Sequence, residues 1–347
     1  MTPADLSLTV LHAVRRAVDE GALRVDVPAR VKVERPRPGG TGDYASSVAL
    51  GLARPAGLDA RAVAAILRER LHDSPGVRSV DITGPGFLNF TLDVDSRQEL
   101  VRDILRRGEE YGRREPTGAV AQLVHRADVR AAVTADAVRR ILASQGTRVR
   151  VSCEDAADPD WALLGARAEA EHARGRLTAD IAPLPVPFGA AELHRRLGRD
   201  AARWGLLSAA GHDHAGLGDE LLHQHEDNPL FRVRYAHSRT RALTRNAEQL
   251  GFRSEPGQTE DATRLLTLLG DHPDVLASAA RHRAPDRVAR HLESLADAFL
   301  AYQHTVLPLG DEKPSAAHRS RLALAEAAGT VLAGGLSLLG ISAPDQI

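Results

Sequence analysis

The stretch AVAQLVHRADVRAAVTADAVRRILASQGTRVRVSC, residues 119–153 of the 347-residue chain, decides the fold. Its apolar runs at 119–124 and 147–153 predict two strands, and residues 128–144 predict a helix that stops at Gly146. A nucleotide-binding sheet needs several such strand–helix–strand crossovers of about 30 residues each. Residues 154–197 leave no room for them, because 182–189 is a proline-rich loop, APLPVPFG. We therefore predict a single βαβ unit and no complete Rossmann-type domain.

The segment before this unit, residues 1–115, has the mixed pattern of an α+β domain. Thr2-Pro3 predicts a capped helix start, and residues 25–33 predict a strand. Apolar residues spaced i, i+3, i+4 and i+8 over 63–71 predict a helix with one buried stripe. Residues 77–82 and 87–92 predict two strands joined at Gly84-Pro85-Gly86.

The segment after the unit, residues 198–347, reads as helical throughout. Apolar residues over 288–302 recur at spacings of 4, 3, 4 and 3, which predicts a long amphipathic helix. Residues 322–339 predict another helix, interrupted at Gly334-Gly335. The sequence thus predicts an all-α bundle at this end of the chain.

The composition narrows the class of protein. Apolar residues make up 43% and charged residues 26%, which is ordinary for a globular chain. We find no run of about 18 apolar residues and expect no membrane span. The single cysteine, Cys153, excludes an intrachain disulfide and a cysteine-rich zinc site, and we expect a cytoplasmic location. The net charge of −1 gives no global signal for nucleic acid, so RNA binding requires a local basic stripe.

Two motifs in the first segment resemble arginyl-tRNA synthetases. They are GDYASSVAL (42–50) and GPGFLNF (84–90), similar to the family's GDYATNVAL and GPGFINF. The resemblance implies the family's N-terminal accessory domain, which grips the outer corner of tRNA where the D-loop lies. It assigns nucleotide contacts to Phe87, as a ring stacked on an unpaired base, and to Asn89, as an amide that reads a base edge. The alternatives are a core position for Phe87 and a hydrogen bond holding the strand turn for Asn89.

The last segment resembles the DALR anticodon-binding domain of the same family. The resemblance rests on GRDAARWGLL (198–207), DNPLFRVRYAHSR (227–239) and the ending APDQI (343–347). It implies contact with the anticodon stem-loop through Arg232, Arg234, Tyr235, His237, Arg239, Arg241 and Ile347. The arginines, with Arg245, would form a phosphate-facing stripe. The alternatives are a solvated helix face for the arginines and a structural hydrogen bond for His237. At the positions of Arg232, Arg234 and Ile347 the family has Tyr, Gln and a terminal Met. These three differences affect which anticodon the domain would recognise.

The central segment HRADVRAAVTADAVRRILASQG (125–146) aligns with the family stretch that carries the His-x-Gly-His signature. His125 remains, but the glycine is replaced by Ala127 and the second histidine by Asp128. A Cβ at Ala127 obstructs the approach of adenine to the backbone, and the Asp128 carboxylate opposes phosphate at a helix N-terminus. The family's Ser-x-Asn-Pro-Thr-Gly and Met-Ser-x-Arg segments have no counterpart. We therefore expect no catalytic residues and no cofactor.

The sequence as a whole predicts a non-catalytic, tRNA-binding relative of arginyl-tRNA synthetase. Residues 1–115 would be the N-terminal-like domain, 116–197 a truncated βαβ remnant of the Rossmann-like catalytic domain acting as a spacer, and 198–347 the DALR-type bundle. We expect tRNA as partner, and neither DNA nor a membrane. The alternatives are a regulatory module that has lost RNA binding and docks on a protein partner, and a residual arginine–tRNA ligase.

A cluster of histidines and acids in the last segment raises the question of a metal site. Its members are His212, Asp213, His214, Asp219, His223 and His225. The corresponding region of the family holds no metal, so we expect none here.

Overall fold

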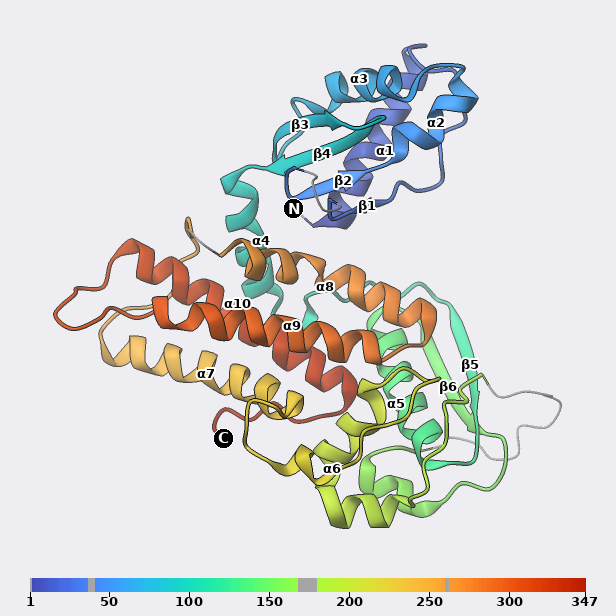
Figure 1. Ribbon diagram of the computed structural model, residues 1–347, viewed down its shortest axis with the longest axis vertical. Coiled ribbons are helices and arrows are strands. Elements are labelled where there is room, and N and C mark those ends of the chain that lie inside the picture. Colours follow the sequence, from blue (N-terminus) through green and yellow to red (C-terminus); the bar gives the residue numbers. More distant parts are fainter. Residues whose placement is uncertain (1, 37–40, 168–179, 260–261) are drawn as a thin grey trace. The chain divides into compact units, whose positions relative to one another are not determined.

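The computed structural model describes residues 2–36, 41–167, 180–259 and 262–347 (Figure 1). It divides into two compact units, Met1–Asp103 and Ile104–Ile347. The first contains α1 (Pro3–Asp19), β1 (Val33–Glu34), β2 (Tyr44–Ser46), α2 (Val48–Ala56), α3 (Ala60–Leu71), β3 (Val77–Thr83), β4 (Phe87–Leu92) and the beginning of α4 (Val94–Arg107).

The strands of the first unit form an antiparallel sheet in the order β1-β2-β4-β3. The predicted hairpin is confirmed, because β3 and β4 pair from Thr83 opposite Phe87 back to Val77 opposite Leu92. Gly86 in its turn has φ +137°, and a Cβ there would lie 2.8 Å from the carbonyl oxygen of Ala60. Backbone conformation and close packing therefore both require the last glycine of the GPG motif.

The start of α1 is confirmed as well. The Thr2 hydroxyl accepts a hydrogen bond from the Asp5 backbone N–H, and the Asp5 carboxylate accepts one from the Thr2 N–H, which makes a capping box. The predicted strand over 25–33 is wrong apart from its last residue, since only Val33–Glu34 pairs. Pro28 in the middle of that stretch has no N–H to give to a ladder. Val25 and Val27 instead pack on the core outside a strand.

The second unit holds the predicted βαβ unit and the helices. Its elements are η1 (Gly108–Glu110), β5 (Val120–His125), α5 (Val129–Ser144), β6 (Arg148–Cys153), η2 (Pro159–Leu164), α6 (Ala190–Ser208), η3 (Asp219–Leu222), α7 (Pro229–Gln249), α8 (Thr263–His282), α9 (Asp286–Tyr302), η4 (Gln303–Thr305) and α10 (Ala316–Leu339).

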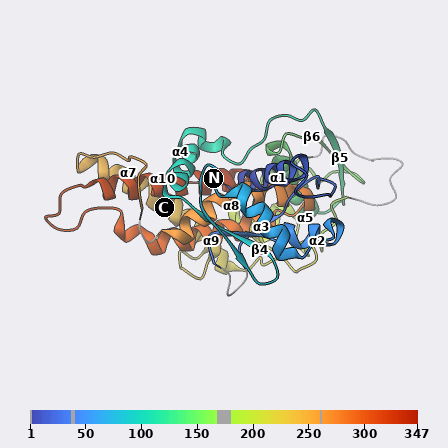
Figure 2. The same cartoon turned by 90° about the horizontal axis from the view of Figure 1, so that it is seen from above.

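The βαβ prediction is confirmed by two parallel strands, β5 and β6, with α5 packed on them (Figures 1 and 2). The shared core includes Leu123, Val138 and Val151. Helix α5 also packs against α6, α8 and α10, so this segment is integral to the second unit. Gly198 breaks α6 with φ +72°, at the residue where the helical pattern of the sequence begins.

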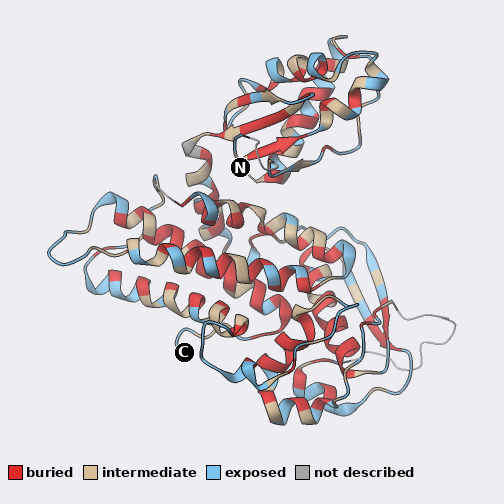
Figure 3. Ribbon diagram, in the orientation of Figure 1, coloured by how far each residue is buried: buried red, intermediate tan, exposed pale blue. Residues whose placement is uncertain are grey.

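The predicted bundle is confirmed, and α10 is its central helix, packed against α7, α8 and α9 and buried along most of its length (Figure 3). The predicted interruption at Gly334-Gly335 is wrong, because α10 continues through both glycines. A Cβ on Gly335 would lie 2.5 Å from Leu292 Cδ2. That glycine therefore serves the close approach of α9 rather than a break in α10.

One helix of the bundle meets the length and composition of a membrane span, which the sequence did not lead us to expect. Within the described residues α10 is long and apolar enough to cross a bilayer, with a mean hydropathy of 1.7 over its most apolar 18-residue window. Yet 72% of that window is buried inside the bundle. This is the environment of a core helix in a globular protein.

An aromatic stack joins the segment after η1 to α8 and α9. The Tyr111 ring lies 6.0 Å from His272, and the His272 ring lies 5.3 Å from His291. The Tyr111 hydroxyl donates to the Leu269 carbonyl at 3.0 Å. His272 is 2% exposed, and burial, reinforced by repulsion from His291, holds its pKa well below the usual value of 6.5. Both effects favour the neutral ring.

Acidification from pH 6.5 to 5.5 should therefore destabilise the second unit. The stability that the neutral His272 ring contributes is fully present above the pKa of this histidine in the unfolded chain. It is lost as the pH falls below that pKa, because the unfolded chain then binds a proton that the folded chain does not bind. One such ring contributes a loss of about 1.4 kcal/mol per pH unit below that pKa. Urea unfolding at the two pH values measures it. His272→Phe should reduce the pH dependence, whereas exposed His304→Phe should retain it; equal dependence in both variants would contradict this role for His272.

Candidate nucleic-acid interface

The first predicted contact lies on the β3–β4 hairpin. Phe87 begins β4 and is half-buried. Asn89 is 2% exposed, and its Nδ2 donates to the Thr83 hydroxyl across the hairpin at 2.7 Å. The amide of Asn89 is thus engaged within the sheet, as in the structural alternative. Of the two residues, Phe87 is the one with surface to offer to a base.

The four predicted arginines of α7 form two rows on the helix rather than one stripe. Arg232 pairs with Asp297 of α9 at 3.2 Å, and Arg239 donates to Gln303 at 2.8 Å. Arg234 and Arg241 lie on another side of the helix, where they contact Ser342 and Asp345. Residues seven apart share a helix face, whereas residues two apart do not. The single phosphate-facing stripe is therefore replaced by two rows that already have partners.

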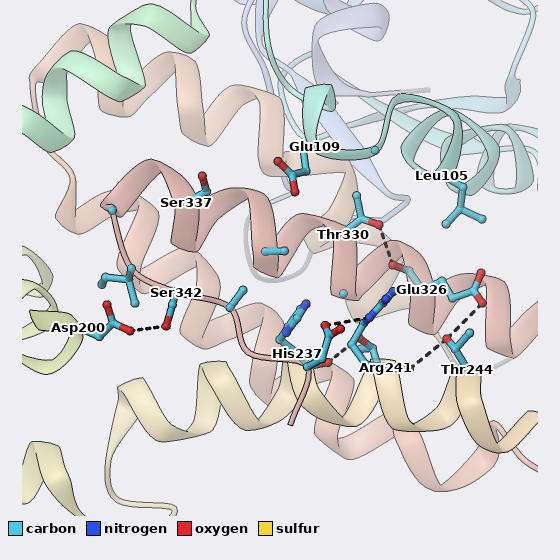
Figure 4. Close-up of a pocket in the computed structure, with 18 of the residues that line it drawn as sticks. Leu105, Glu109, Asp200, His237, Arg241, Thr244, Glu326, Thr330, Ser337 and Ser342 are labelled. Carbon is cyan, nitrogen blue, oxygen red and sulfur yellow. Dashed lines mark hydrogen bonds and ion pairs between the residues drawn. The ribbon is translucent and has the colours of Figure 1, made fainter. Parts of the chain in front are cut away.

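The second row meets the end of the chain, where a pocket of about 800 Å³ opens between α7, α10 and residues 340–345 (Figure 4). Arg241 Nε lies 3.1 Å from an Asp345 carboxylate oxygen, and Arg234 Nη2 donates to the Ser342 hydroxyl at 3.3 Å. Arg140, Arg199 and Glu326 also line this pocket.

His237 is buried, at 5% exposed, on the wall of the same pocket. Its Nδ1 lies 3.0 Å from the Pro344 carbonyl oxygen. A carbonyl only accepts, so Nδ1 carries the proton and Nε2 keeps its lone pair. Burial lowers the pKa of His237, against the opposing effect of the Pro344 carbonyl. The structural hydrogen bond that we considered for His237 is therefore present.

Tyr235 is the most accessible aromatic candidate on α7. Its side chain is 37% exposed, and its ring stacks on Phe231 at 5.6 Å with an interplanar angle of 17°. Ile347 is 50% exposed and lines a second pocket of about 510 Å³ together with Phe231 and Arg234. Exposed stacked rings suit an unpaired base.

The segment 125–128, which aligns with the family signature, lies at the N-terminus of α5. Asp128 is the N-cap residue, and its carboxylate accepts from the Ala131 N–H at 2.9 Å. Glu154, from the end of β6, accepts from the Ala127 N–H at 3.2 Å. Burial raises the pKa of Asp128, although hydrogen bonds from the helix backbone oppose the shift. Two carboxylates of the chain itself thus accept from backbone N–H groups at the start of α5.

His125 is buried beside this helix end. It is 1% exposed, its Nδ1 donates to the Arg126 carbonyl at 2.7 Å, and its ring meets the edge of Trp161 at 5.5 Å. Burial lowers the pKa of His125. The structure thus brings His125, Ala127 and Asp128 together, but the imidazole is packed in the core and its Nδ1 is already bonded.

The sequence patterns did not single out Arg130 and Arg203, two buried arginines of the second unit. Arg130 donates to five backbone carbonyls, and Arg203 pairs with Asp136 at 2.8 Å and donates to two more carbonyls. Both are at most 1% exposed. Their positions within otherwise apolar helical patterns, DVRAAV and DAARWGLL, could have indicated that both side chains are buried. They organise the second unit and do not face a ligand.

The histidine–acid cluster forms no metal cage in the described part of the chain, where no three His, Cys, Asp or Glu side chains converge. His212 lies 3.7 Å from Asp213, and His225 lies 3.2 Å from Asp227. All four side chains are exposed, in loops between α6 and α7.

Comparison with protein families identifies both ends of the chain. Residues 8–92 match the arginyl tRNA synthetase N-terminal domain, and residues 233–347 match the DALR anticodon-binding domain. These two models leave residues 93–232 uncovered.

Individual relatives extend this assignment over the whole chain. Arginine–tRNA ligases of Renibacterium salmoninarum and Frankia alni are 28% and 29% identical, and each alignment covers all of both chains. The first alignment runs over 549 positions, 202 more than the 347 residues of this chain. The fold is also that of the Thermus thermophilus and Plasmodium falciparum arginyl-tRNA synthetases. Their TM-scores are 0.75 and 0.69, their identities 16% and 10%, and the matches cover 100% and 99% of both chains. The chain is thus similar over its whole length to arginine–tRNA ligases, and its two ends match an arginyl tRNA synthetase N-terminal domain and a DALR anticodon-binding domain.

Proposed function

We propose that this chain is a cytoplasmic tRNA-binding member of the arginyl-tRNA synthetase family that does not form arginyl-adenylate. The observation that carries the proposal is the N-terminus of α5, where Asp128 and Glu154 accept from backbone N–H groups. Negative charge at that position opposes the triphosphate of ATP and the charge that develops during its attack. The length of the alignments supports it too, because the relatives contain long segments that this chain lacks.

The DALR domain carries the RNA-binding half of the proposal. Tyr235 presents an exposed ring beside Phe231, and the surrounding helix is rich in arginine. Contacts to phosphates make RNA affinity depend on salt, whereas stacking contacts do not. The two contributions can therefore be separated by measurement.

The rival function is that of the relatives, which are named arginine–tRNA ligases. It is favoured by homology that extends over the full length of this chain. It requires arginine-dependent exchange of pyrophosphate into ATP and transfer of arginine to tRNA. A third possibility, a module that docks on another protein, predicts neither turnover nor specific RNA binding.

Total tRNA should bind the full chain, and the affinity should fall steeply with salt, by about 10³-fold between 50 and 200 mM if some six phosphates are contacted. Filter binding over a salt series measures this, with pyrophosphate exchange and aminoacylation assayed on the same preparation and a catalytically active relative as positive control. Turnover well above a no-enzyme blank would overturn the non-catalytic part. Binding no tighter than to an unrelated RNA would overturn the tRNA-binding part.

Tyr235→Ala locates the contact on α7. Base stacking on an aromatic ring is worth about 1–3 kcal/mol, so the variant should bind tRNA about fivefold to 150-fold more weakly with an unchanged salt slope. Leu250→Ala at the other end of the helix, where Leu250 is 51% exposed, is the matched control and should bind as the parent does. Equal affinity of the two variants would exclude Tyr235 as a stacking platform.

A further inference from the structure

The segment Ser342–Ile347, here called the C-terminal strap, lies along α7 and is held by polar contacts. Ile341, just before it, is 3% exposed, whereas each residue of the strap is partly or fully exposed. Burial of apolar surface therefore fixes the chain as far as Ile341. Hydrogen bonds and an ion pair hold the residues that follow.

The near end of the strap is tied to α6 and α7 (Figure 4). The Ser342 hydroxyl donates to the Asp200 carboxylate and accepts from Arg234 Nη2 at 3.3 Å. The same Arg234 nitrogen lies 3.9 Å from Asp200. The guanidinium of Arg234 thus already has a carboxylate and a hydroxyl beside it.

The far end of the strap lies along the middle of α7. The Pro344 carbonyl accepts from His237 Nδ1 at 3.0 Å, and the Asp345 carbonyl accepts from the Ser238 hydroxyl at 3.2 Å. The Asp345 carboxylate lies 3.1 Å from Arg241 Nε. Each of these strap groups is an acceptor that faces a donor on the helix.

The donors belong to one side of α7, here called the α7 row: Arg234, His237, Ser238 and Arg241. Spacings of three and four residues place them together on the helix surface. Without the strap this side would present the guanidinium groups of Arg234 and Arg241 directly to solvent. A guanidinium fork fits a phosphate as well as it fits a carboxylate.

We propose that the C-terminal strap is a displaceable, autoinhibitory cover whose acceptor groups occupy the α7 row in place of the phosphates of a bound RNA. The strap must move aside before Arg234, whose side chain is 29% exposed, and the strap-facing side of Arg241 bind a phosphate backbone. The identity of the anion as RNA rests on the proposed function. The competition itself rests only on the contacts given above.

The strap is held weakly enough to move. Asp345 and Arg241 are 61% and 52% exposed, and ion pairs between such exposed side chains contribute little. The remaining contacts are single hydrogen bonds; three have their donors on α7, which would find equivalent acceptors on a phosphate chain, and the fourth runs from the Ser342 hydroxyl to Asp200. A polyanion offers several such acceptors at once, so it forms more favourable contacts with the α7 row than the strap does.

Two variants of the full chain test the competition. Asp345→Asn removes the carboxylate without changing its size, and a chain ending at Ile341 removes the strap entirely. At 100 mM salt we expect tRNA to bind Asp345→Asn up to about fivefold more tightly, the gain of losing one exposed ion pair. The shortened chain also loses Ile347, an expected RNA contact, so its affinity for inorganic tripolyphosphate is the quantity that should rise further. The dependence of log affinity on log salt should steepen by about 1.4 to 1.8 if both guanidinium groups gain a phosphate.

The matched control is Asp311→Asn, which changes the net charge equally at an exposed position in the turn before α10 and should leave the affinity unchanged. Inorganic tripolyphosphate serves as a second probe, independent of RNA. If the two strap variants bind tripolyphosphate more tightly but no chain binds tRNA, the strap proposal stands and the proposed RNA function is overturned. tRNA binding that is unchanged or weaker in Asp345→Asn, with tripolyphosphate binding unchanged in both strap variants, would overturn the strap proposal and leave the RNA function standing.

Discussion

Replacing Asp136 by alanine is expected to destabilise the second unit by about 3–5 kcal/mol, the usual cost of leaving a buried charge without its partner. Arg203 is fully buried, and its other two hydrogen bonds go to the neutral carbonyls of Leu339 and Leu164. Asp136 therefore supplies the counter-charge in contact with this guanidinium. Because Leu339 ends α10 and Leu164 ends η2, the same arginine ties the βαβ segment to the bundle.

The pKa values agree with a charged pair at neutral pH. Burial alone would raise the pKa of Asp136, but attraction and hydrogen bonds from Arg203, Arg139 and Arg140 hold it below its usual value. Burial lowers the pKa of Arg203 against the attraction of Asp136. An arginine starts so far above neutral pH that it stays protonated. The stability contributed by Asp136 is present at neutral pH and is lost in acid, as the pH falls through its folded-state pKa.

Equilibrium urea unfolding followed by circular dichroism measures the effect, with Glu248→Ala as the control. Glu248 is an exposed acid on α7, and its removal should change the free energy of unfolding by less than about 0.5 kcal/mol. A loss below 1 kcal/mol for Asp136→Ala would mean that water or another acid reaches Arg203. Arg203→Met with Asp136→Leu should recover much of the loss, because a well-packed apolar pair often replaces a buried ion pair at little cost.

The second large effect is expected from Arg130→Met, which should cost about 3 kcal/mol or more. The Arg130 guanidinium donates to the carbonyls of Leu184, Leu206, Ala209, Ala210 and Asp213 at 2.7 to 3.3 Å. Buried acceptors left without donors cost about 1–3 kcal/mol each, while the variant regains the cost of burying a cation. Five acceptors outweigh one recovered desolvation penalty, so the net change is a loss.

The damage should be local at first, because those carbonyls belong to the end of α6, the turn after it and the proline-rich loop before it. Hydrogen exchange at 206–216 should therefore accelerate more than exchange in α9 or α10. Arg130→Lys, which keeps the charge but offers fewer donors, should fall between the parent and Arg130→Met. Arg126→Met, at an exposed position near the same helix, should match the parent. Hydrogen exchange that accelerates equally throughout the second unit would contradict a local role for Arg130.

Local patterns were sufficient for most helices and strands. The cap at Thr2, the GPG hairpin, the βαβ unit and the amphipathic helix α9 follow from neighbouring residues, because capping, turn geometry and side-chain periodicity act over a few positions. The strand predicted over 25–33 failed at Pro28, where the ladder lacks a donor. The break predicted in α10 failed because Gly335 accommodates Leu292, a residue of another helix.

The sequence by itself determined the two domain matches at the ends of the chain and the segment between them, which carries His125, Ala127 and Asp128. Only the tertiary structure decided what each of those residues does. Arg203, Arg234 and Arg241 all lie in quoted motifs, yet one is a buried ionic link and two lie under the strap. Their partners are 67, 108 and 104 positions away in the chain. Helix periodicity shows which side chains share a face, but the element that covers that face is set by packing over such distances, and with it whether an arginine is a core charge or a site for phosphate.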